Sequence, residues 1–384
     1  MKWPLMHDAV TASDKLALVN FILNSDRYTN GVKVKEFEAE WSKWLGAKHS
    51  LMVSSGSTAN TLLIAAVKEM FGLKNGDKVV VPACTWVTNI SPVFQNGLQP
   101  IFCDVNLDNY SFDLDNLKYI AQQHPDVKVV FTTHLMGFPA YTERYKEIFP
   151  NAIHLDDLCE SHGVKDSHGQ KHGANSTGST FSFYFAHHIT TIEGGMISTN
   201  NDDLYDLMRM KRSHGMAREA VNPEMYTSRY PDIHKAFLFM TDGYNFRSTE
   251  LNAVLGLEQL KRLDDYIKVR NMNLELYCEL INANPLFHKV HYYPGASNYA
   301  FPLIAQEKEV RDKLVKLLDE HDIEHRPVIG GNLLRQPFLK DYQMCTNKDL
   351  TNADILHYNG LYIGNSPFVT PTNIRVLQTV LDKL

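Results

Sequence analysis

Two adjacent histidines, His187 and His188, are the side chains in this sequence best suited to moving protons. They follow an apolar, aromatic run that starts at Phe181 and predicts a buried strand. A threonine pair, Glu193 and a Gly-Gly turn come next, and residues 196–199 predict a second strand. Imidazole has an ordinary pKa of about 6.5, so it can accept and release a proton near neutral pH. A tight hairpin with two incidental histidines is the alternative interpretation.

A second segment has the residue types of an anion site. Ser54-Ser-Gly-Ser-Thr58 lies between a short strand predicted at 51–53 and a helix predicted over 59–71. A turn of small residues that opens a helix presents unpaired backbone N–H groups and the positive end of the helix dipole, which suits a phosphate. A serine-rich N-cap explains the same residues equally well. The GxxxxGK[ST] and GxGxxG patterns of nucleotide loops do not occur in this turn.

The elements between these two segments predict a mainly parallel sheet. Strands predicted at 78–82, 100–104, 127–133 and 152–156 alternate with helical stretches, which is typical of βαβ units. Ligands bind such sheets beyond the carboxyl ends of the strands. Asp157 follows the last of these strands, so it is either a site residue or the N-cap of the next helix.

Composition and charge exclude several classes of protein. The chain has 384 residues, of which 44% are hydrophobic and 21% charged, as in an ordinary globular protein of two domains. Its net charge of −6 argues against nucleic-acid binding, which needs a basic surface. Apolar runs such as 79–83 are too short to cross a membrane, and the N-terminus has no signal-peptide core. We therefore expect a cytoplasmic protein.

The cysteines and the remaining histidines give little support to a metal centre. The five cysteines are scattered without a CxxC pattern, which favours reduced thiols over a zinc site or an iron–sulfur cluster. His321 and His325 have helical i, i+4 spacing, but no third ligand lies nearby and the HExxH pattern is missing. We expect no metal site.

The segment around the histidine pair resembles the cofactor-lysine segment of the DegT/StrS-type family of pyridoxal-phosphate enzymes, which act on nucleotide-linked keto sugars. The family pattern is approximately S-F-x-x-x-K-x-I-T-T-G-E-G-G, and residues 182–195 follow it with two exceptions. His187 occupies the position of the Schiff-base lysine, and Ile192 occupies a position that is usually glycine. No lysine lies between Lys171 and Lys211, so a shift of register cannot supply one.

The resemblance covers almost the whole chain and implies roles for further residues. In the family, the small-residue turn holds the cofactor phosphate, and an aromatic ring stacks on the pyridine. A carboxylate keeps the pyridine nitrogen protonated, which makes the cofactor an electron sink. The matching positions are Gly56, Ser57, Thr58 and Ser182 for the phosphate, Trp86 for the ring face and Asp157 for the ring nitrogen.

The resemblance also implies a homodimer with shared active sites. In relatives the loop that matches residues 243–251 crosses to the other subunit, where Asn245 would reach the cofactor phosphate. Cationic side chains near the substrate would meet its carboxylate or phosphate groups. The matching substrate-side positions are His214, Arg218, Arg247, Glu324 and Arg326.

The implied fold is α/β and aspartate-aminotransferase-like (fold type I). It has a mainly parallel mixed sheet in a large cofactor-binding domain, expected over residues 1–250, and a smaller α+β domain over 251–384. One long helix or two are predicted over 248–281, and strands at 289–293 and 299–304.

A histidine in the lysine position changes the expected reaction. An imidazole cannot hold the cofactor covalently, but it can carry protons. The cofactor would then be bound without a covalent link and rest as pyridoxamine phosphate. Members of the family with this histidine remove the C3 hydroxyl of a nucleotide-linked 4-keto sugar, with L-glutamate restoring the cofactor amine and ammonia released.

Two kinds of histidine-bearing enzyme match this pattern. One acts on a CDP-linked sugar and carries an iron–sulfur cluster, and the other acts on a GDP-linked 4-keto sugar and carries none. The scattered cysteines favour the second. The alternatives are a nucleotide-sugar aminotransferase, an enzyme like the CDP-sugar dehydrase, and a non-catalytic relative that binds sugar nucleotides.

Overall fold

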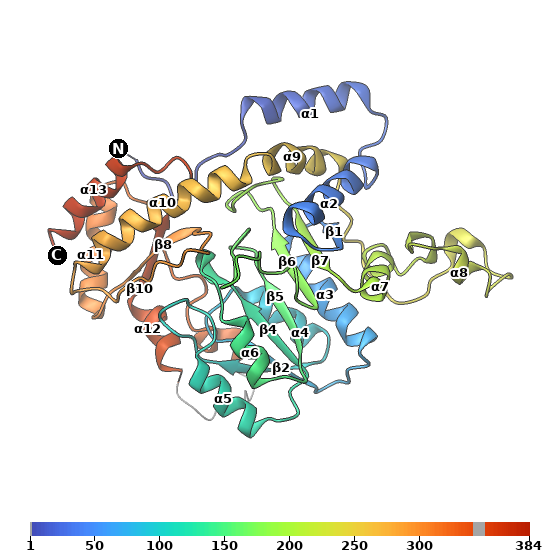
Figure 1. Ribbon diagram of the computed structural model, residues 1–384, viewed down its shortest axis with the longest axis horizontal. Helices are drawn as coiled ribbons and strands as arrows, with labels where there is room; N and C mark the ends of the chain where they lie inside the picture. The colour runs from blue at the N-terminus through green and yellow to red at the C-terminus, as the bar shows by residue number, and fades with distance from the viewer. Residues whose placement is uncertain (1, 341–349) are drawn as a thin grey trace.

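The computed structural model describes residues 2–340 and 350–384 (Figure 1). Its centre is a seven-stranded sheet with the order β1-β7-β6-β5-β4-β2-β3. All neighbouring strands from β6 to β3 are parallel, and β7 is antiparallel to both of its neighbours, so the sheet is mixed and mainly parallel, as predicted. The strands are β1 (His49–Val53), β2 (Lys78–Pro82), β3 (Gln99–Cys103), β4 (Val129–Thr133), β5 (Ile153–Asp157), β6 (Gly178–Ser182) and β7 (Gly195–Thr199).

Helices cover both faces of this sheet. Val79 and Val81 of β2 belong to a core that contains α3, whereas Val80 belongs to a core with α5 and α6. Successive side chains of a strand point to opposite faces, so these helices lie on opposite sides. The helices of this part are α1 (Ala12–Asn24), α2 (Val32–Leu45), α3 (Gly56–Met70), α4 (Ser91–Gln95), α5 (Leu114–Gln123), α6 (Thr142–Ile148), α7 (Asp202–Arg212), α8 (Glu224–Thr227) and α9 (Glu250–Leu260).

Aromatic packing fixes the strand that leads to the histidine pair. The rings of Phe181 and Phe183 lie 5.0 Å and 4.9 Å from Trp41 of α2, in edge-to-face arrangements. Such pairs contribute about 0.5–1.5 kcal/mol each beyond the burial of their surface. All three side chains are fully buried. The amphipathic helix α2 therefore holds β6 in place.

Glu250, the first residue of α9, closes the N-terminus of α2. Its carboxylate accepts hydrogen bonds from the backbone N–H groups of Gly31 (2.8 Å), Lys33 (2.9 Å) and Val34 (3.0 Å). The first N–H groups of a helix have no partner within the helix, and a negative charge there is favourable. Gly31 itself offers no side-chain cap. A residue distant in sequence thus supplies the missing cap.

The C-terminal part contains a three-stranded antiparallel sheet of order β8-β10-β9 and returns to the start of the chain. Trp3 is buried there, and its indole N–H donates to the carbonyl of Gly364 (3.0 Å). The division after residue 250 stays a prediction. The elements are α10 (Leu263–Asn282), β8 (Ala300–Ile304), α11 (Lys308–Glu320), β9 (His325–Pro327), α12 (Thr351–Asn359), β10 (Gly360–Gly364) and α13 (Pro371–Leu381).

One prediction about the C-terminal part is wrong, and the helical spacing of two histidines has no helix behind it. Residues 289–293 form no strand, because the side chain of Asn282 takes both backbone groups of Val290: its oxygen accepts from the N–H (2.8 Å) and its amide donates to the carbonyl (2.9 Å). His321 and His325 do not share a helix, since α11 ends at Glu320 and His325 begins β9. They are therefore not a ligand pair.

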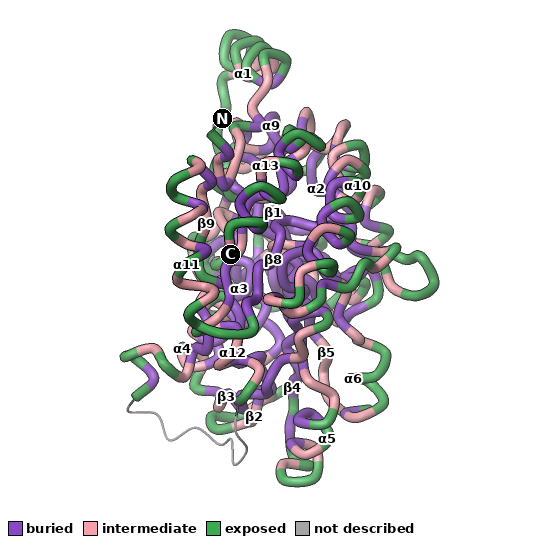
Figure 2. The backbone as a smooth tube through the Cα atoms, turned by 90° about the vertical axis from the view of Figure 1, so that its left-hand side faces the viewer, coloured by how far each residue is buried: buried purple, intermediate pink, exposed green. Residues whose placement is uncertain are grey.

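Burial follows the layers of the fold. Figure 2 shows buried residues along the central strands and α3, whereas α1 is largely exposed. Among the helices of the described residues, none is both long and apolar enough to span a membrane.

Candidate active site

Three of the predicted residues meet at the carboxyl edge of the sheet. Asp157 ends β5 and Ser182 ends β6, and these strands are parallel. Gly56, at the start of α3, packs against them: a Cβ atom there would lie 2.6 Å from Cβ of Ser182 and 3.0 Å from Sγ of Cys159. Only glycine allows this approach, which places the positive end of α3 beside the Ser182 hydroxyl.

The predicted anion turn is the first turn of α3, which starts three residues earlier than expected. Ser55 is its N-cap: its hydroxyl accepts from the N–H of Thr58 (3.1 Å), and the Thr58 hydroxyl accepts from the N–H of Ser55 (2.9 Å). The hydroxyl of Thr58 therefore serves the capping box. Ser57 is exposed and Gly56 is buried. The N-cap interpretation is confirmed, and the anion interpretation stays a prediction.

Asp157 is held by a network that includes a residue the sequence analysis missed. Asn60 donates to one carboxylate oxygen (2.8 Å), and the N–H of Cys159 donates to the other (2.9 Å). Thr180 donates to the Asn60 side-chain oxygen (2.6 Å). Asn60 lies one helical turn after Gly56 and so faces the same way, a spacing that could have identified it. The network fixes a buried carboxylate at the end of β5.

Glu160, in the same loop as Asp157, is a second acid that the sequence analysis left without a role. Its carboxyl accepts a hydrogen bond from the N–H of Met136 (3.0 Å). Burial, with a smaller contribution from the charge of Asp157, raises the pKa of Glu160 to about 7. This group can therefore carry a proton near neutral pH.

Trp86 presents a flat aromatic surface beyond the end of β2. It precedes the short 3-10 helix Val87–Asn89, and 56% of its surface is exposed. Large aromatic side chains are usually buried, so an exposed indole at the ligand-binding edge of a sheet is suited to stacking on a planar ring.

The two histidines differ in their hydrogen bonds. Both lie in the loop between β6 and β7, so the alternation of a strand does not decide which one faces the site. His188 is fully buried, and its Nε2–H donates to the carbonyl of Ser297 (2.8 Å). His187 is partly exposed. Nδ1 has no hydrogen-bond partner in either ring among the described residues, so the two rings differ in the Ser297 bond and in their exposure. His187 is therefore the histidine whose ring is available to exchange a proton.

Both imidazoles are neutral at neutral pH. Burial lowers the pKa of His187 to about 3, and the positive charge of Arg270 contributes to the shift. Burial also lowers the pKa of His188 well below its ordinary value, again with a contribution from Arg270. A neutral imidazole has a lone pair with which it can accept a proton.

Two loops bring several predicted substrate residues together. The backbones of Ser213 and Asn245 pair in an antiparallel bridge, and the N–H of His214 donates to the carbonyl of Tyr244 (2.7 Å). The carbonyl of Phe246 accepts from the N–H of Ser54 (3.0 Å), which joins the second loop to the start of α3. The exposed side chains of this group are His214, Arg218 and Asn245, and Arg247 is partly buried.

Glu324 and Arg326 have different surroundings. The Glu324 carboxylate accepts from the N–H of Leu5 (3.0 Å) and pairs with Lys2 (3.1 Å), so it ties the N-terminal segment to the C-terminal part. These two contacts lower the pKa of Glu324. Arg326 lies on β9 with an exposed side chain. Of the two, Arg326 has the more accessible charge.

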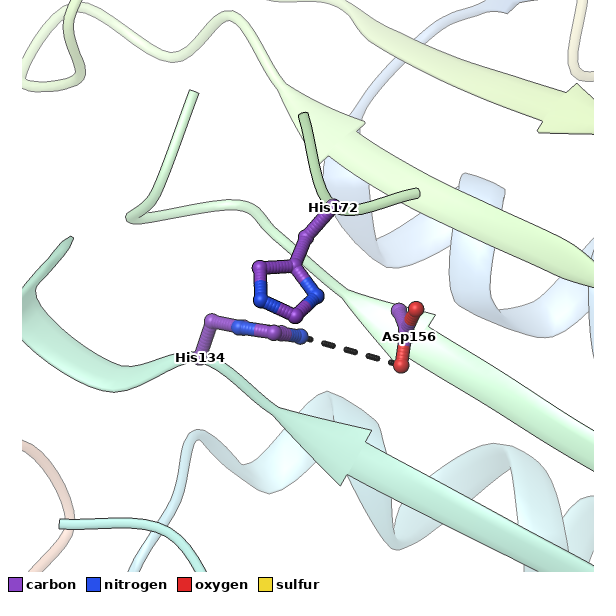
Figure 3. A group of neighbouring side chains, drawn as sticks. All are labelled: His134, Asp156 and His172. Carbon is purple, nitrogen blue, oxygen red and sulfur yellow. Dashed lines mark ion pairs between the residues drawn. The ribbon is translucent and has the colours of Figure 1, made fainter. Parts of the chain in front are cut away.

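A further polar cluster lies across the sheet from Asp157 (Figure 3). Asp156 points to the opposite face of β5, where its carboxylate lies 3.7 Å from Nε2 of His134 and beside the ring of His172. The N–H of Ala140 donates to Nδ1 of His134 (3.1 Å), so the neutral ring carries its proton on Nε2. A metal ion would need the lone pair of that atom. The cluster therefore does not form a favourable metal site.

Comparisons of the sequence support the interpretation of the cofactor-lysine segment. Residues 10–381 match the DegT/DnrJ/EryC1/StrS aminotransferase family. The chain is 34% identical to GDP-4-keto-6-deoxy-D-mannose 3-dehydratase of Yersinia pseudotuberculosis, over 96% of this chain and 95% of that protein. It is 32% identical to the enzyme of the same name from Escherichia coli O55:H7, over 94% and 95% of the two chains.

The fold agrees with these sequence matches. The structure is similar to that of E. coli GDP-4-keto-6-deoxy-D-mannose-3-dehydratase with bound hydrated PLP, with a TM-score of 0.92, 31% identity and 99% of each chain covered. A structure of the dehydratase with a trapped PLP-glutamate geminal diamine gives a TM-score of 0.91. The predicted fold type I architecture is confirmed. The chain belongs to the DegT/DnrJ/EryC1/StrS aminotransferase family.

Proposed function

We propose that this protein removes the C3 hydroxyl of GDP-4-keto-6-deoxy-D-mannose and forms GDP-4-keto-3,6-dideoxy-D-mannose. It uses pyridoxal 5'-phosphate in its pyridoxamine form, with L-glutamate as amino donor and ammonia as by-product. One observation carries the proposal: a neutral, unpartnered imidazole, His187, occupies the position of the family's lysine. The residues suited to the cofactor remain around it.

The residues present fit the cofactor. The N-terminus of α3 at Gly56 and Ser57, with the Ser182 hydroxyl, would hold the phosphate, and Trp86 would cover a face of the ring. Asp157, already oriented by Asn60, would pair with the ring nitrogen. When bound, the cofactor supplies an amine for the sugar's keto group and a ring that takes up electrons.

His187 moves the protons of the reaction. Its neutral ring accepts a proton at a nitrogen, because the ring has a lone pair and its pKa is low. The protonated ring then passes that proton to the departing C3 hydroxyl. Lysine in this position would do the same work and also bind the cofactor covalently, so histidine retains only the proton transfer. Dehydration without amination of the product follows.

Exposed cationic side chains would bind the charged end of the substrate. Arg218 and Arg326 are exposed and Arg247 is partly buried, and guanidinium groups pair well with phosphates. His214 lies between Arg218 and the Asn245 loop. For Glu324 to bind substrate as predicted, its ion pair with Lys2 and its hydrogen bond with the N–H of Leu5 must break.

A homodimer with shared sites accounts for two further features. Asn245 is exposed, and the segment around α8 extends away from the body in Figure 1. Exposed apolar side chains of this kind mark interaction surfaces. We place a second copy against this segment, with Asn245 reaching the cofactor of its partner. The exposed apolar residues of the segment are Val221, Met225, Tyr230, Ile233, Phe237 and Phe239.

The shared site can be tested by subunit mixing. In homodimers, Asn245→Ala and His187→Asn should each strongly reduce the activity of both sites. Refolded mixtures contain hybrids in which one site has both wild-type residues, so activity should return on mixing. Mixtures that stay inactive although hybrids form would rule out the shared site.

The reaction belongs to deoxysugar synthesis in the cytoplasm. Its product is a precursor of 3,6-dideoxy sugars such as colitose in the O-antigens of lipopolysaccharide.

One incubation tests the activity. The protein is mixed with pyridoxal phosphate, L-glutamate and GDP-4-keto-6-deoxymannose, and the products are analysed by mass spectrometry and an ammonia assay. We expect a 3-deoxy sugar and ammonia. An amino sugar would instead identify an aminotransferase, and no turnover would favour a non-catalytic protein.

The role of His187 has its own test. His187→Asn should lower kcat roughly 10²–10⁴-fold, because general acid–base catalysis contributes about that much. The dissociation constant of the cofactor should change little. His188→Asn is the matched control: it removes the bond to Ser297 and should reduce stability more than chemistry. Full activity of His187→Asn would show that another group moves the proton.

A further inference from the structure

Arg270 places a buried positive charge behind the histidine pair. It lies on α10 with 5% of its surface exposed, and among the described residues no carboxylate lies within ion-pairing distance of it. Burial lowers the pKa of Arg270 to about 10, so the group stays charged at neutral pH. Burying a cation without a counter-ion is costly, and such groups are normally paired.

The guanidinium is oriented by backbone groups and is not fully hydrogen-bonded. Its Nη1 donates to the carbonyls of Asn365 and Tyr299, and its Nε has no partner. The Asn365 amide in turn donates to the carbonyl of Arg270 (2.9 Å). The side chain is thus held firmly on one side, and its charge is not neutralised.

The charge faces the proposed base. Arg270, His187 and His188 line the same small enclosed cavity, together with His7 and Tyr299. The ring of Tyr299 lies 5.6 Å from His187. In a low-dielectric interior an unpaired charge acts over several ångströms, and it opposes a second positive charge nearby.

We propose that Arg270 is a positioning residue for proton transfer: its buried guanidinium keeps the His187 imidazole neutral before the reaction and makes the protonated imidazole release its proton. This inference rests on the proposed role of His187. A base that must later act as an acid benefits from a neighbour that destabilises its protonated form. Burial lowers the pKa of His7, His162 and His188, and the same charge contributes, so the imidazoles around the site stay neutral.

Other groups around His187 do not replace this charge. His162 comes from the loop after β5, Tyr184 and His188 from the histidine loop, Tyr299 from the residue before β8, and His7 from the N-terminal segment. Burial lowers the pKa of the three histidines and raises the pKa of Tyr299, so these four groups carry no charge at pH 7. Arg270 is therefore the cation to change.

Two substitutions separate charge from hydrogen bonding. Arg270→Gln keeps a donor for the carbonyls and removes the charge, whereas Arg270→Lys keeps the charge. The titration of the His187 ring is followed by NMR in protein labelled at histidine, without substrate, with His187→Asn for assignment. We expect wild type and Arg270→Lys to stay neutral to the lowest pH at which they are folded. Arg270→Gln should titrate at a pH higher by about one unit or more.

The same variants predict a change in the pH profile of activity. The acid limb of kcat/KM should move to higher pH in Arg270→Gln and stay in place in Arg270→Lys. Arg262→Gln is the matched control, because Arg262 lies just before α10 but pairs with Asp14. It should lower stability without altering the His187 titration.

Several results would overturn the inference. A folded Arg270→Gln protein with an unchanged His187 titration would leave Arg270 a structural residue. If that variant does not fold, the NMR titration of the wild-type protein still tests the proposal. A wild-type His187 ring that becomes protonated near pH 6 would contradict it. The two proposals can be rejected independently. A fully active His187→Asn enzyme would show that His187 is not the base, whereas the effect of Arg270 on the His187 pKa is measured by NMR without any activity.

Discussion

At the scale of single residues, one hydrogen bond distinguishes two neighbouring imidazoles. Nε2 of His188 bonds to Ser297, in the segment before β8, and the His187 ring has no such bond among the described residues, while Nδ1 is unpartnered in both rings. Their sequence context does not distinguish them, because both lie in a loop rather than a strand. The family pattern singles out His187, and the hydrogen bonds favour the same residue.

The backbone explains why the family usually has glycine where this chain has Ile192. Ile192 has φ = 69°, in the left-handed region that disfavours β-branched residues. The turn is held there by its neighbours, since Asn252 donates to the carbonyls of Thr191 (2.6 Å) and Glu193 (3.0 Å). Half of the Ile192 surface is exposed, so its own packing contributes little. The conformation belongs to the turn, and isoleucine adopts it at a cost.

Ile192→Gly should therefore stabilise the protein. Replacing a β-branched residue in left-handed backbone by glycine removes a strain of about 1–2 kcal/mol from the folded state. The greater freedom of glycine in the unfolded chain opposes this gain in stability by roughly 0.5–1 kcal/mol. We expect a net gain of about 0.5–1 kcal/mol in the free energy of unfolding, measured by urea denaturation. Ile22→Gly is the control, because Ile22 is similarly exposed without a positive φ and should lose stability. If both substitutions changed the free energy of unfolding equally, Ile192 would not be strained.

At the scale of elements, the order of strands and helices was predictable from the alternation of apolar and helical stretches. The strand at 78–82 has the predicted bounds, and two helices, α9 and α10, lie within 250–282, where one long helix or two were predicted over 248–281. The errors have local causes. Small polar residues obscured the start of α3, and a side chain of Asn282 captured the backbone at Val290 that would have formed a strand.

The cap of α2 gives a test at this scale. Glu250→Gln keeps one oxygen but removes the charge that three N–H groups share, so it should lower the free energy of unfolding by roughly 2 kcal/mol. The change would appear as a lower thermal midpoint. Glu36→Gln on the same helix is the control, because Glu36 only pairs with Lys33 at the surface. If Glu250→Gln and Glu36→Gln lowered the thermal midpoint equally, the Glu250 cap would contribute no more than a surface ion pair.

At the scale of the whole molecule, the family pattern picked out residues that the fold brings together, whose roles stay predictions, but not the residues that support them. Asp157, Ser182 and Gly56 meet as predicted from one motif each. Asn60 and Arg270 carry no motif, since they act through contacts with residues distant in sequence. Such contacts depend on the complete fold, so a single sequence does not specify them.

Buried neutral histidines make the fold sensitive to acid. The four with strongly lowered pKa values bind protons near pH 6.5 when unfolded but not when folded, so the unfolded state gains protons as pH falls. Stability is complete above about pH 7 and decreases toward pH 4, by up to roughly 1.4 kcal/mol per pH unit for each group. The residues are His162, His172, His187 and His188.

Urea denaturation at pH 7.5, 6.5 and 5.5 measures this dependence. Burial lowers the pKa of His172 to about 3, so this residue takes up a proton on unfolding. His172→Gln removes that site, so unfolding should take up as much as one proton fewer and the free energy of unfolding should fall less steeply with decreasing pH. A free energy of unfolding that stays constant over this range would show that these rings titrate normally.

The strand order has a consequence for how the protein forms during synthesis. β1 leaves the ribosome first but pairs only with β7, residue His49 opposite Thr199, and therefore has no partner until the whole interior of the sheet has been translated. Contacts between such distant segments form slowly. The nascent chain must therefore keep an apolar strand from aggregating throughout that interval.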